Sequence, residues 1–103
     1  MQIAADELLV ELDRVDGLML DVVRHAGQGC SPAFERRLEA QLRSLRSMLG
    51  VDGTQAAADV MEAATRALES AEPTAPLLML SIARKTLAAV IRRQAGDARL
   101  RAA

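Results

Sequence analysis

The chain has 103 residues, a size typical of a single domain. Hydrophobic residues make up 50%, but Phe34 is the only aromatic, and alanine and leucine dominate over β-branched residues, which favours helices over strands. The formal net charge of −1 excludes a global field that would attract nucleic acid or an anionic membrane. Because Cys30 is the only cysteine, no intramolecular disulfide can form, and a reducing cytoplasm is the natural compartment.

Two further features support the cytoplasmic expectation. The N-terminal segment includes Asp6 and Glu7 and lacks the basic and apolar regions of a signal peptide. The most apolar stretch, residues 77–91, is interrupted by Arg84 and Lys85 and is shorter than a helix that spans a bilayer. We therefore expect a cytoplasmic protein without a membrane partner, and a composition rich in alanine, arginine and leucine favours a bacterial source.

Four segments carry apolar residues at spacings of three and four, the pattern of helices with one apolar face. We expect helices at about residues 4–26, 32–49, 54–70 and 75–95. Their connections are short, so adjacent helices should run antiparallel in an all-α four-helix bundle. No repeat or linker divides the chain, which predicts one helical domain over 1–103 with a frayed tail at 97–103.

The ends of these segments carry residues that start and stop helices. Gly27 and Gly29 follow the first segment, and Ser31-Pro32 offers the second an N-cap followed by proline at the first helical position. Thr54 is the expected cap of the third segment. That segment has a thin apolar stripe among many alanines, so we expect it at the periphery of the bundle or against a close neighbour.

The sign of the charge alternates along the chain. Residues 1–30 carry six acidic and two basic residues, whereas residues 74–103 carry one acidic and six basic residues. Between them, residues 31–50 have a net charge of +2 and residues 51–73 of −4. We interpret this as electrostatic matching of neighbouring helices, in which each exposed pair contributes at most ~1 kcal/mol. The basic C-terminus keeps nucleic-acid binding as an alternative, although no aromatic residue there can stack on bases.

The fourth segment is apolar around most of its circumference. At about 100° per residue, its apolar residues fill an arc of roughly 220°. A helix at the edge of a small bundle needs an apolar arc of little more than about 100°. Either this helix lies at the centre, surrounded by the other three, or one flank meets a second copy or a partner protein. We favour the second arrangement, because soluble monomers avoid large exposed apolar patches.

The predicted homodimer interface uses the fourth segment and one residue of the first, namely Leu78, Met79, Ile82, Ala83, Arg84, Thr86, Val90 and Asp16. Asp16 and Glu11 lie close to the apolar face of the first segment. Because an unpaired buried carboxylate is costly, Asp16 either reaches water at the edge or pairs with a base of the fourth segment. Arg84, Lys85 and Arg92 are the candidate partners, and a catalytic acid is a third interpretation.

Asp21 and His25 lie four residues apart, a spacing that metal sites use, and Cys30 follows in the next loop. No second histidine or cysteine completes a ligand set, and no third residue orients Cys30 for nucleophilic catalysis. Glycine-rich phosphate-binding motifs are absent from the sequence. We therefore expect no metal, no cofactor and no enzyme activity.

The stretch Leu12-Asp13-Arg14-Val15-Asp16 resembles the I-D-x-I-D stretch in the first helix of the all-helical chorismate mutases, which have a similar length. That resemblance implies a small helical enzyme acting on an anionic substrate. In the family a catalytic arginine precedes the first of these apolar positions by three residues, where this chain has Leu9. We predict a non-catalytic protein that acts through protein–protein contact. The alternatives are an enzyme of this type and a nucleic-acid-binding regulator that uses the basic C-terminus.

Overall fold

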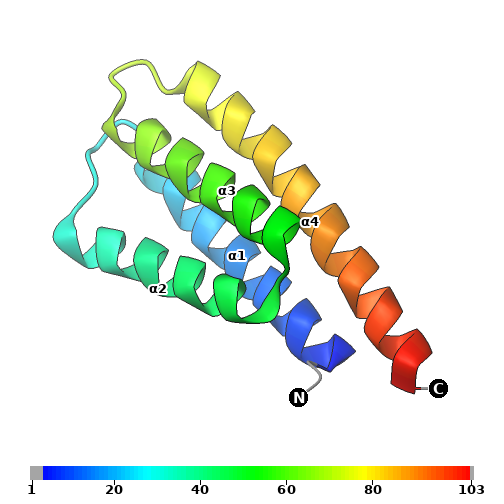
Figure 1. Cartoon of the computed structure of the whole chain (residues 1–103). Helices are drawn as coiled ribbons and strands as arrows, with labels where there is room; N and C mark the ends of the chain where they lie inside the picture. The colour runs from blue at the N-terminus through cyan, green and yellow to red at the C-terminus, as the bar shows by residue number, and fades with distance from the viewer. Residues whose placement is uncertain (1–3, 103) are drawn as a thin grey trace.

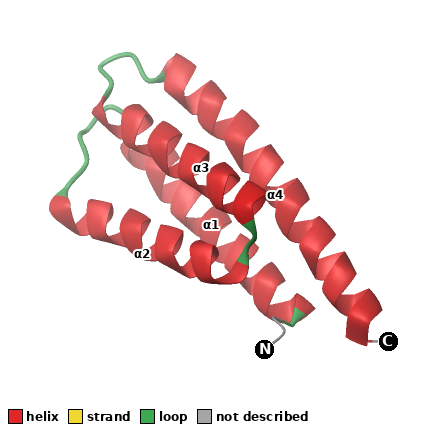
Figure 2. Cartoon of the chain, in the orientation of Figure 1, coloured by secondary structure: helices red, strands yellow, loops and turns green. Residues whose placement is uncertain are grey.

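The computed structural model describes residues 4–102, which form four helices and no strand. In chain order these are α1 (Ala5–His25), α2 (Pro32–Met48), α3 (Val51–Glu69) and α4 (Thr74–Ala102) (Figure 1). Short loops join them (Figure 2). The predicted all-α four-helix fold is confirmed. The molecule is elongated, with principal extents of 49 × 24 × 21 Å, and α4 follows its long direction (Figure 1).

α3 is the central helix. It packs most extensively against α4 and also contacts α2 and α1, whereas α2 does not pack along α4. Ala57, Ala64 and Ala67 of α3 are completely buried, and such small side chains allow neighbouring helices to approach closely. The expectation of a peripheral position for this helix is therefore wrong, and that of a close neighbour is confirmed by its contact with α4.

Every helix contributes to one core. The largest fully buried side chains are Leu8, Val15, Val22, Leu45, Val60, Leu68, Leu87 and Ile91. Burial of each side chain of this kind stabilises the fold by about 1.5–3 kcal/mol relative to exposure. α1, α3 and α4 supply most of these side chains, and α2 buries only Leu38 and Leu45 within its own length. α2 is therefore the helix held by the fewest apolar contacts.

The loop after α1 closes one end of α3. Gly27 and Gly29 have φ angles of 80° and 89°, a conformation that side chains disfavour. Their N–H groups donate to the carbonyl oxygens of Ala67 and Leu68 at distances of 3.0 and 2.7 Å. These carbonyls lie in the last turn of α3, where no helical donor remains. The predicted glycine stop therefore ends one helix and caps another.

The two starts predicted from caps have different outcomes. At α2, the Phe34 N–H donates to Ser31 Oγ at 3.2 Å and Pro32 begins the helix, as predicted. At α3, the expected cap at Thr54 is wrong, because the helix begins at Val51 with Gly50 at the N-cap position. The Thr54 N–H instead donates to the Gly50 carbonyl oxygen at 2.9 Å, inside the first turn.

α4 is longer than predicted. It runs through Gly96 to Ala102, so the expected end near residue 95 is wrong and the tail continues the helix. A single glycine inside a helix costs only about 1 kcal/mol, and the residues after Gly96 are mainly alanine, arginine and leucine, which favour helix. Ala95 is buried, and Gln94 Nε2 donates to the Met48 carbonyl oxygen at 2.6 Å, which holds this part of α4 against the end of α2.

Candidate functional site

The outer side of α4 carries an uncovered apolar surface. Leu78, Met79 and Ile82 are 63%, 59% and 52% exposed, and we call these three residues the α4 ridge. The opposite side of the same helix is buried through Leu80 and Leu87. The alternative in which the other three helices surround α4 is wrong, because α4 packs along α3 and α1 but not along α2. One flank of α4 is therefore covered by its own chain, and the other flank is exposed.

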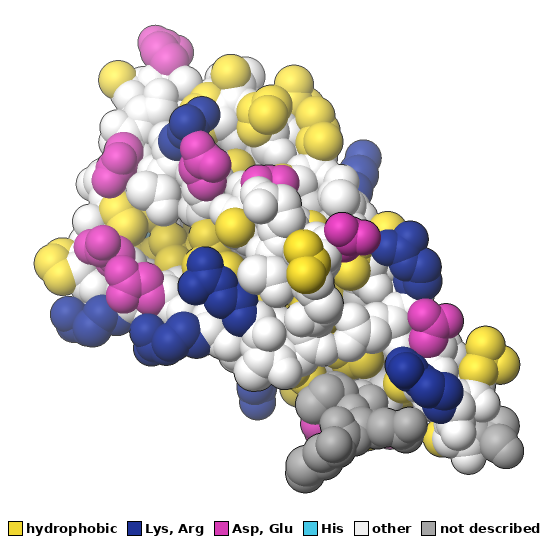
Figure 3. Space-filling view, in the orientation of Figure 1, with side chains coloured by type: hydrophobic (Ala, Val, Ile, Leu, Met, Phe, Trp, Pro, Cys, Tyr) yellow, Lys and Arg dark blue, Asp and Glu magenta, His cyan; other side chains and the backbone are white. Residues whose placement is uncertain are grey.

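Hollows lie on both sides of the α4 ridge. A groove of about 550 Å³ separates α3 from α4; alanines such as Ala56 and Ala63 line it, and Asp59, Glu62 and Arg66 carry the charge there. A second hollow of about 330 Å³ lies between α1 and α4. Figure 3 shows hydrophobic side chains gathered over the N-terminal half of α4. The surface thus has the form of an apolar ridge with a groove on either side.

Leu20 and Val23 of α1 extend this apolar surface. They are 60% and 57% exposed and line the hollow between α1 and α4 together with Leu77. Both fall outside the predicted interface, although their apolar character beside the seam of α1 is visible in the sequence. The uncovered region therefore involves two helices rather than α4 alone.

The predicted partnership of Asp16 with the fourth helix occurs within one chain. Arg84 Nε donates to Asp16 Oδ1 and Arg84 Nη2 donates to Asp16 Oδ2, both at 2.8 Å. The two side chains are 33% and 38% exposed, and this hydrogen bond to the carboxylate raises the pKa of Arg84. The parallel pair of bonds joins α1 to α4 beside the α4 ridge, so it fixes their relative position and neutralises both charges there.

Of the remaining predicted interface residues, two lie along the groove beside α3 and one packs against α3. Ala83 is half-buried and Thr86 is exposed, and both line the groove. Val90 is half-buried against α3, where its side chain lies 3.1 Å from the position that a Cβ on Gly53 would occupy. Val90 therefore makes a contact within its own chain.

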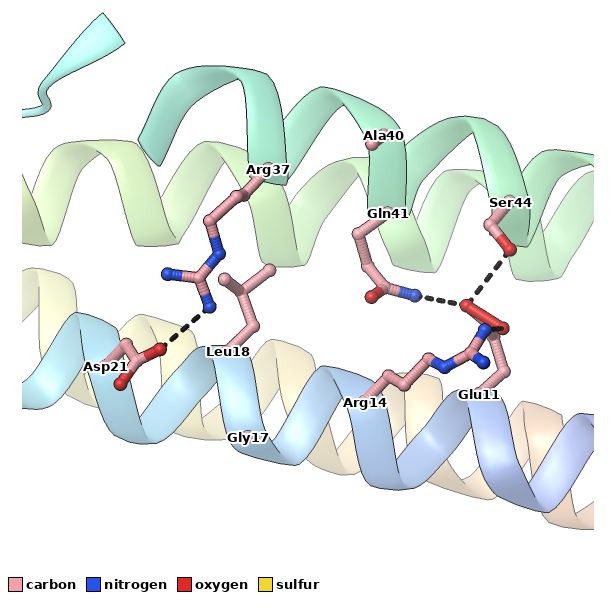
Figure 4. A pocket seen from close by; sticks show the side chains of 9 residues that line it. All are labelled: Glu11, Arg14, Gly17, Leu18, Asp21, Arg37, Ala40, Gln41 and Ser44. Atoms are coloured by element: carbon pink, nitrogen blue, oxygen red, sulfur yellow. Dashed lines mark hydrogen bonds and ion pairs between the residues drawn. The ribbon is translucent and has the colours of Figure 1, made fainter. Parts of the chain in front are cut away.

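A polar cavity of about 540 Å³ lies between α1 and α2 (Figure 4). Glu11 is only 4% exposed, and its carboxylate accepts hydrogen bonds from the Gln41 amide and the Ser44 hydroxyl of α2, the latter at 3.0 Å. Arg14 Nη1 approaches the same carboxylate at 3.3 Å. Glu11 is thus a buried charge with donors from two helices, which the α1 pattern alone does not reveal, because Gln41 and Ser44 lie about thirty residues away.

The other end of this cavity holds a second ion pair. Arg37 Nη2 donates to Asp21 Oδ2 at 2.8 Å, and this hydrogen bond lowers the pKa of Asp21. The Arg37 guanidinium also lies 5.1 Å from the centre of the Phe34 ring. Asp21 is nearer the end of α1 and Arg37 nearer the start of α2, whereas the Glu11 contacts have the reverse order, so the two helices run in opposite directions. Each arginine of the cavity therefore already faces a carboxylate.

Asp21, His25 and Cys30 do not form a shared site. His25 Nδ1 lies 2.9 Å from the backbone oxygen of Asp21, while the Asp21 carboxylate binds Arg37. Burial, with a smaller effect of Glu35, raises the pKa of the Cys30 thiol and so disfavours the nucleophilic thiolate. Across residues 4–102, no group of three His, Cys, Asp or Glu side chains is placed to hold a metal ion.

The full length of α4 bears on the question of membranes. By length and composition α4 is long and apolar enough to cross a bilayer, since its most apolar 18 residues have a mean hydropathy of 1.4. The expectation that this region is too short is therefore corrected, because the helix extends beyond residues 77–91. Core helices of water-soluble proteins meet the same criteria, so a single helix of this kind is weak evidence for a membrane.

Comparison with models of protein families, with curated proteins and with solved structures finds no match to this chain. The surface of α4 and the polar cavity between α1 and α2 are therefore the features of the chain that bear on its function.

Proposed function

We propose that this is a non-catalytic helical protein that acts through protein–protein contact and associates with itself as a homodimer. The observation that carries the proposal is the α4 ridge, where Leu78, Met79 and Ile82 are each more than half exposed on consecutive turns. Contiguous exposed apolar residues of this kind mark interaction surfaces, since water is a poor solvent for them.

A second copy is the occupant that the shape of this surface favours. Helices pack by inserting the ridge of side chains on one into the groove on the other. In an isologous dimer the same patch of both copies forms the contact, so the side chains of one α4 ridge interdigitate with those of the other. The grooves on either side of the ridge leave room for the two helices to approach. The charges of Asp16 and Arg84, which lie beside the ridge, neutralise each other within the chain. The same surface can therefore serve as both halves of an interface.

Sedimentation equilibrium over a range of concentrations tests the proposal. We expect a mass that rises with concentration from 11.0 kDa towards twice that value. Ile82→Glu should raise the dissociation constant about tenfold or more, because it buries an unpaired carboxylate in the interface. Leu100→Glu is the matched control, since Leu100 is 77% exposed on the same helix but far from the α4 ridge, and it should dimerise normally.

A mass that stays at 11.0 kDa into the high micromolar range would contradict the proposal. Co-sedimentation of such a monomer with phosphatidylcholine vesicles would identify a membrane surface as the occupant of the α4 ridge instead. Equal dissociation constants for Ile82→Glu and the unmodified chain would also contradict the proposal, because the contact would then lie on another surface.

The second candidate is the chorismate-mutase-type enzyme, which one observation favours. Such an enzyme needs basic groups around its anionic substrate, and the cavity between α1 and α2 contains Arg14 and Arg37. Because Glu11 and Asp21 already neutralise these arginines, we rank this function second. An assay of chorismate consumption tests it, and an activity that Arg37→Ala abolishes and Arg43→Ala preserves would favour the enzyme.

A further inference from the structure

Resting on the proposed homodimer, we infer that the second copy packs with its α4 antiparallel to α4 of the first, around a two-fold axis close to Ile82. The partner is thus a second copy in one defined register. Three features lead to this arrangement: the spacing of the small residues in α4, the opposite charges at similar sequence separations before and after Ile82, and the like charges that a parallel arrangement would bring together.

The small residues allow close approach on both sides of Ile82. Ala75 and Ala89 are exposed and lie seven residues before and after it, which places each about 10 Å along the helix. At about 100° per residue, both project within roughly 20° of the direction of Ile82. An antiparallel pair centred there sets Ala75 of one copy against Ala89 of the other. The helices can therefore close on the apolar contact without obstruction at either side.

Charges of opposite sign occur at matching distances from the same centre. Glu72 lies ten residues before Ile82, while Arg92 and Arg93 lie ten and eleven residues after it. All three are exposed, and none of them forms an ion pair among the residues that the structure describes. Arg92 and Arg93 lie on α4 about 15 Å from Ile82, whereas Glu72 lies in the turn just before α4 begins at Thr74. The two-fold axis brings these arginines to the end of the contact where Glu72 of the partner subunit lies.

A parallel pair of helices lacks this match. Each residue of α4 would then face its own counterpart, so Lys85, Arg92 and Arg93 would meet like charges along the contact. In the antiparallel pair, Lys85 instead faces the region of Met79, where its aliphatic stem can cover apolar surface. The same two-fold axis sets the α1 flanks of the copies on one side, which lets Leu20 and Val23 extend the contact.

Cysteine cross-linking in a Cys30→Ser background tests the register. Facing helices whose axes lie about 8–10 Å apart bring the Cα atoms next to a two-fold axis to about 3.5–5.5 Å, which overlaps the Cα separation of a disulfide. Ile82→Cys should therefore form a disulfide-linked dimer under copper–phenanthroline oxidation. Ala89→Cys should not link to itself, because its two copies lie roughly 20 Å apart, but it should link to Ala75→Cys in an equimolar mixture.

Efficient linking of Ala89→Cys to itself would overturn the inference in favour of a parallel dimer. A dimeric mass without linking at Ile82→Cys would overturn it in favour of another register. Either result leaves the proposed homodimer standing. A monomeric mass of the unoxidised chain removes the homodimer itself and, with it, the inference.

Charge reversal tests the antiparallel register independently of cross-linking. Arg92→Glu combined with Arg93→Glu should raise the dissociation constant about tenfold, because both ends of the contact lose a favourable pair and gain a repulsive one. Adding Glu72→Arg should restore the original value in the antiparallel register. The reversal of Arg99 and Arg101 in α4 is the matched control and should leave association unchanged. Failure of Glu72→Arg to rescue the reversal would contradict the register.

Discussion

The α3–α4 contact and the α1–α2 contact join their helices in different ways. The α3–α4 contact is the most extensive in the molecule, and α3 contributes buried alanines while α4 contributes large buried residues such as Leu87 and Ile91. Between α1 and α2 lies a polar cavity with the buried Glu11 carboxylate at one end and the Asp21–Arg37 pair at the other. The first contact is non-directional and large, whereas the second consists of a few directional bonds.

The two contacts therefore contribute to the fold in different ways. Apolar burial at α3 and α4 supplies the driving force for folding, because that term grows with the area removed from water. Hydrogen bonds at α1 and α2 add less net free energy, but they fix which residues face one another. α2 should therefore be the first helix to open, and α3 the last.

The largest predicted effect tests the apolar contact. Leu87→Ala removes a completely buried side chain from α4 and should lower the free energy of unfolding by about 2–5 kcal/mol. Leu100→Ala, at a position that is 77% exposed on the same helix, should change it by less than about 0.5 kcal/mol. Urea denaturation followed by circular dichroism measures both. Similar values for the two variants would show that α4 is not anchored through its inner side.

The next effect tests the polar contact. Glu11→Ala removes the shared acceptor of Gln41 and Ser44 and should lower the free energy of unfolding by roughly 1–3 kcal/mol. Arg14→Ala is the control, because Arg14 is 65% exposed and its loss should cost less than about 1 kcal/mol. Hydrogen exchange in Glu11→Ala should accelerate mainly in α2. Uniform acceleration of hydrogen exchange in all four helices would contradict the different contributions of the two contacts.

Replacing either of two helical glycines with alanine should change the stability of the fold, but in opposite directions. A Cβ on Gly53 would lie 2.7 Å from the Leu49 Cβ and 3.1 Å from Val90, so Gly53→Ala should destabilise the fold by about 1 kcal/mol through overpacking. At Gly17, beside the polar cavity, nothing lies within 4 Å, and Gly17→Ala should stabilise it by about 0.5–1 kcal/mol. Thermal unfolding measures both changes. Equal signs would mean that helix propensity outweighs packing around Gly53.

The contacts that could be predicted from the sequence are those that depend on nearby residues or on a helix face. Ser31-Pro32 marks the start of α2 by its own chemistry. The position of Asp16 beside the apolar face of α1 leaves water or a base such as Arg84 as its expected partner, and the structure shows the base. The exposed α4 ridge follows from an apolar arc wider than one neighbouring surface can cover. Each of these inferences needs only one segment and a rule about its surroundings.

The contacts that could not be predicted depend on distant residues. Gly53 directly precedes the predicted start of the third helix, and only the positions of Leu49 and Val90 show that α3 includes it at a place where glycine alone fits without displacement. Glu11 is at the edge of the α1 stripe, and its burial depends on donors in another helix. The alanines of α3 are apolar but small, so their contribution to packing arises from the close approach of α4, which no pattern within α3 specifies.

The smallest predicted effect is the pH dependence of the stabilisation by Arg37, which distinguishes its bond to Asp21 from its contact with the Phe34 ring. Because Arg37 lowers the pKa of Asp21 in the folded chain, their bond stabilises the fold at pH above the ordinary value of 3.8, and this stabilisation is lost as the pH falls through the lowered pKa. Arg37→Ala should therefore destabilise the chain at neutral pH, and the difference should shrink in strong acid. Arg43→Ala on the same helix should show no such trend. The contact of Arg37 with the Phe34 ring does not depend on the charge of Asp21, so a difference that stays constant with pH would assign the role of Arg37 to packing on the ring instead.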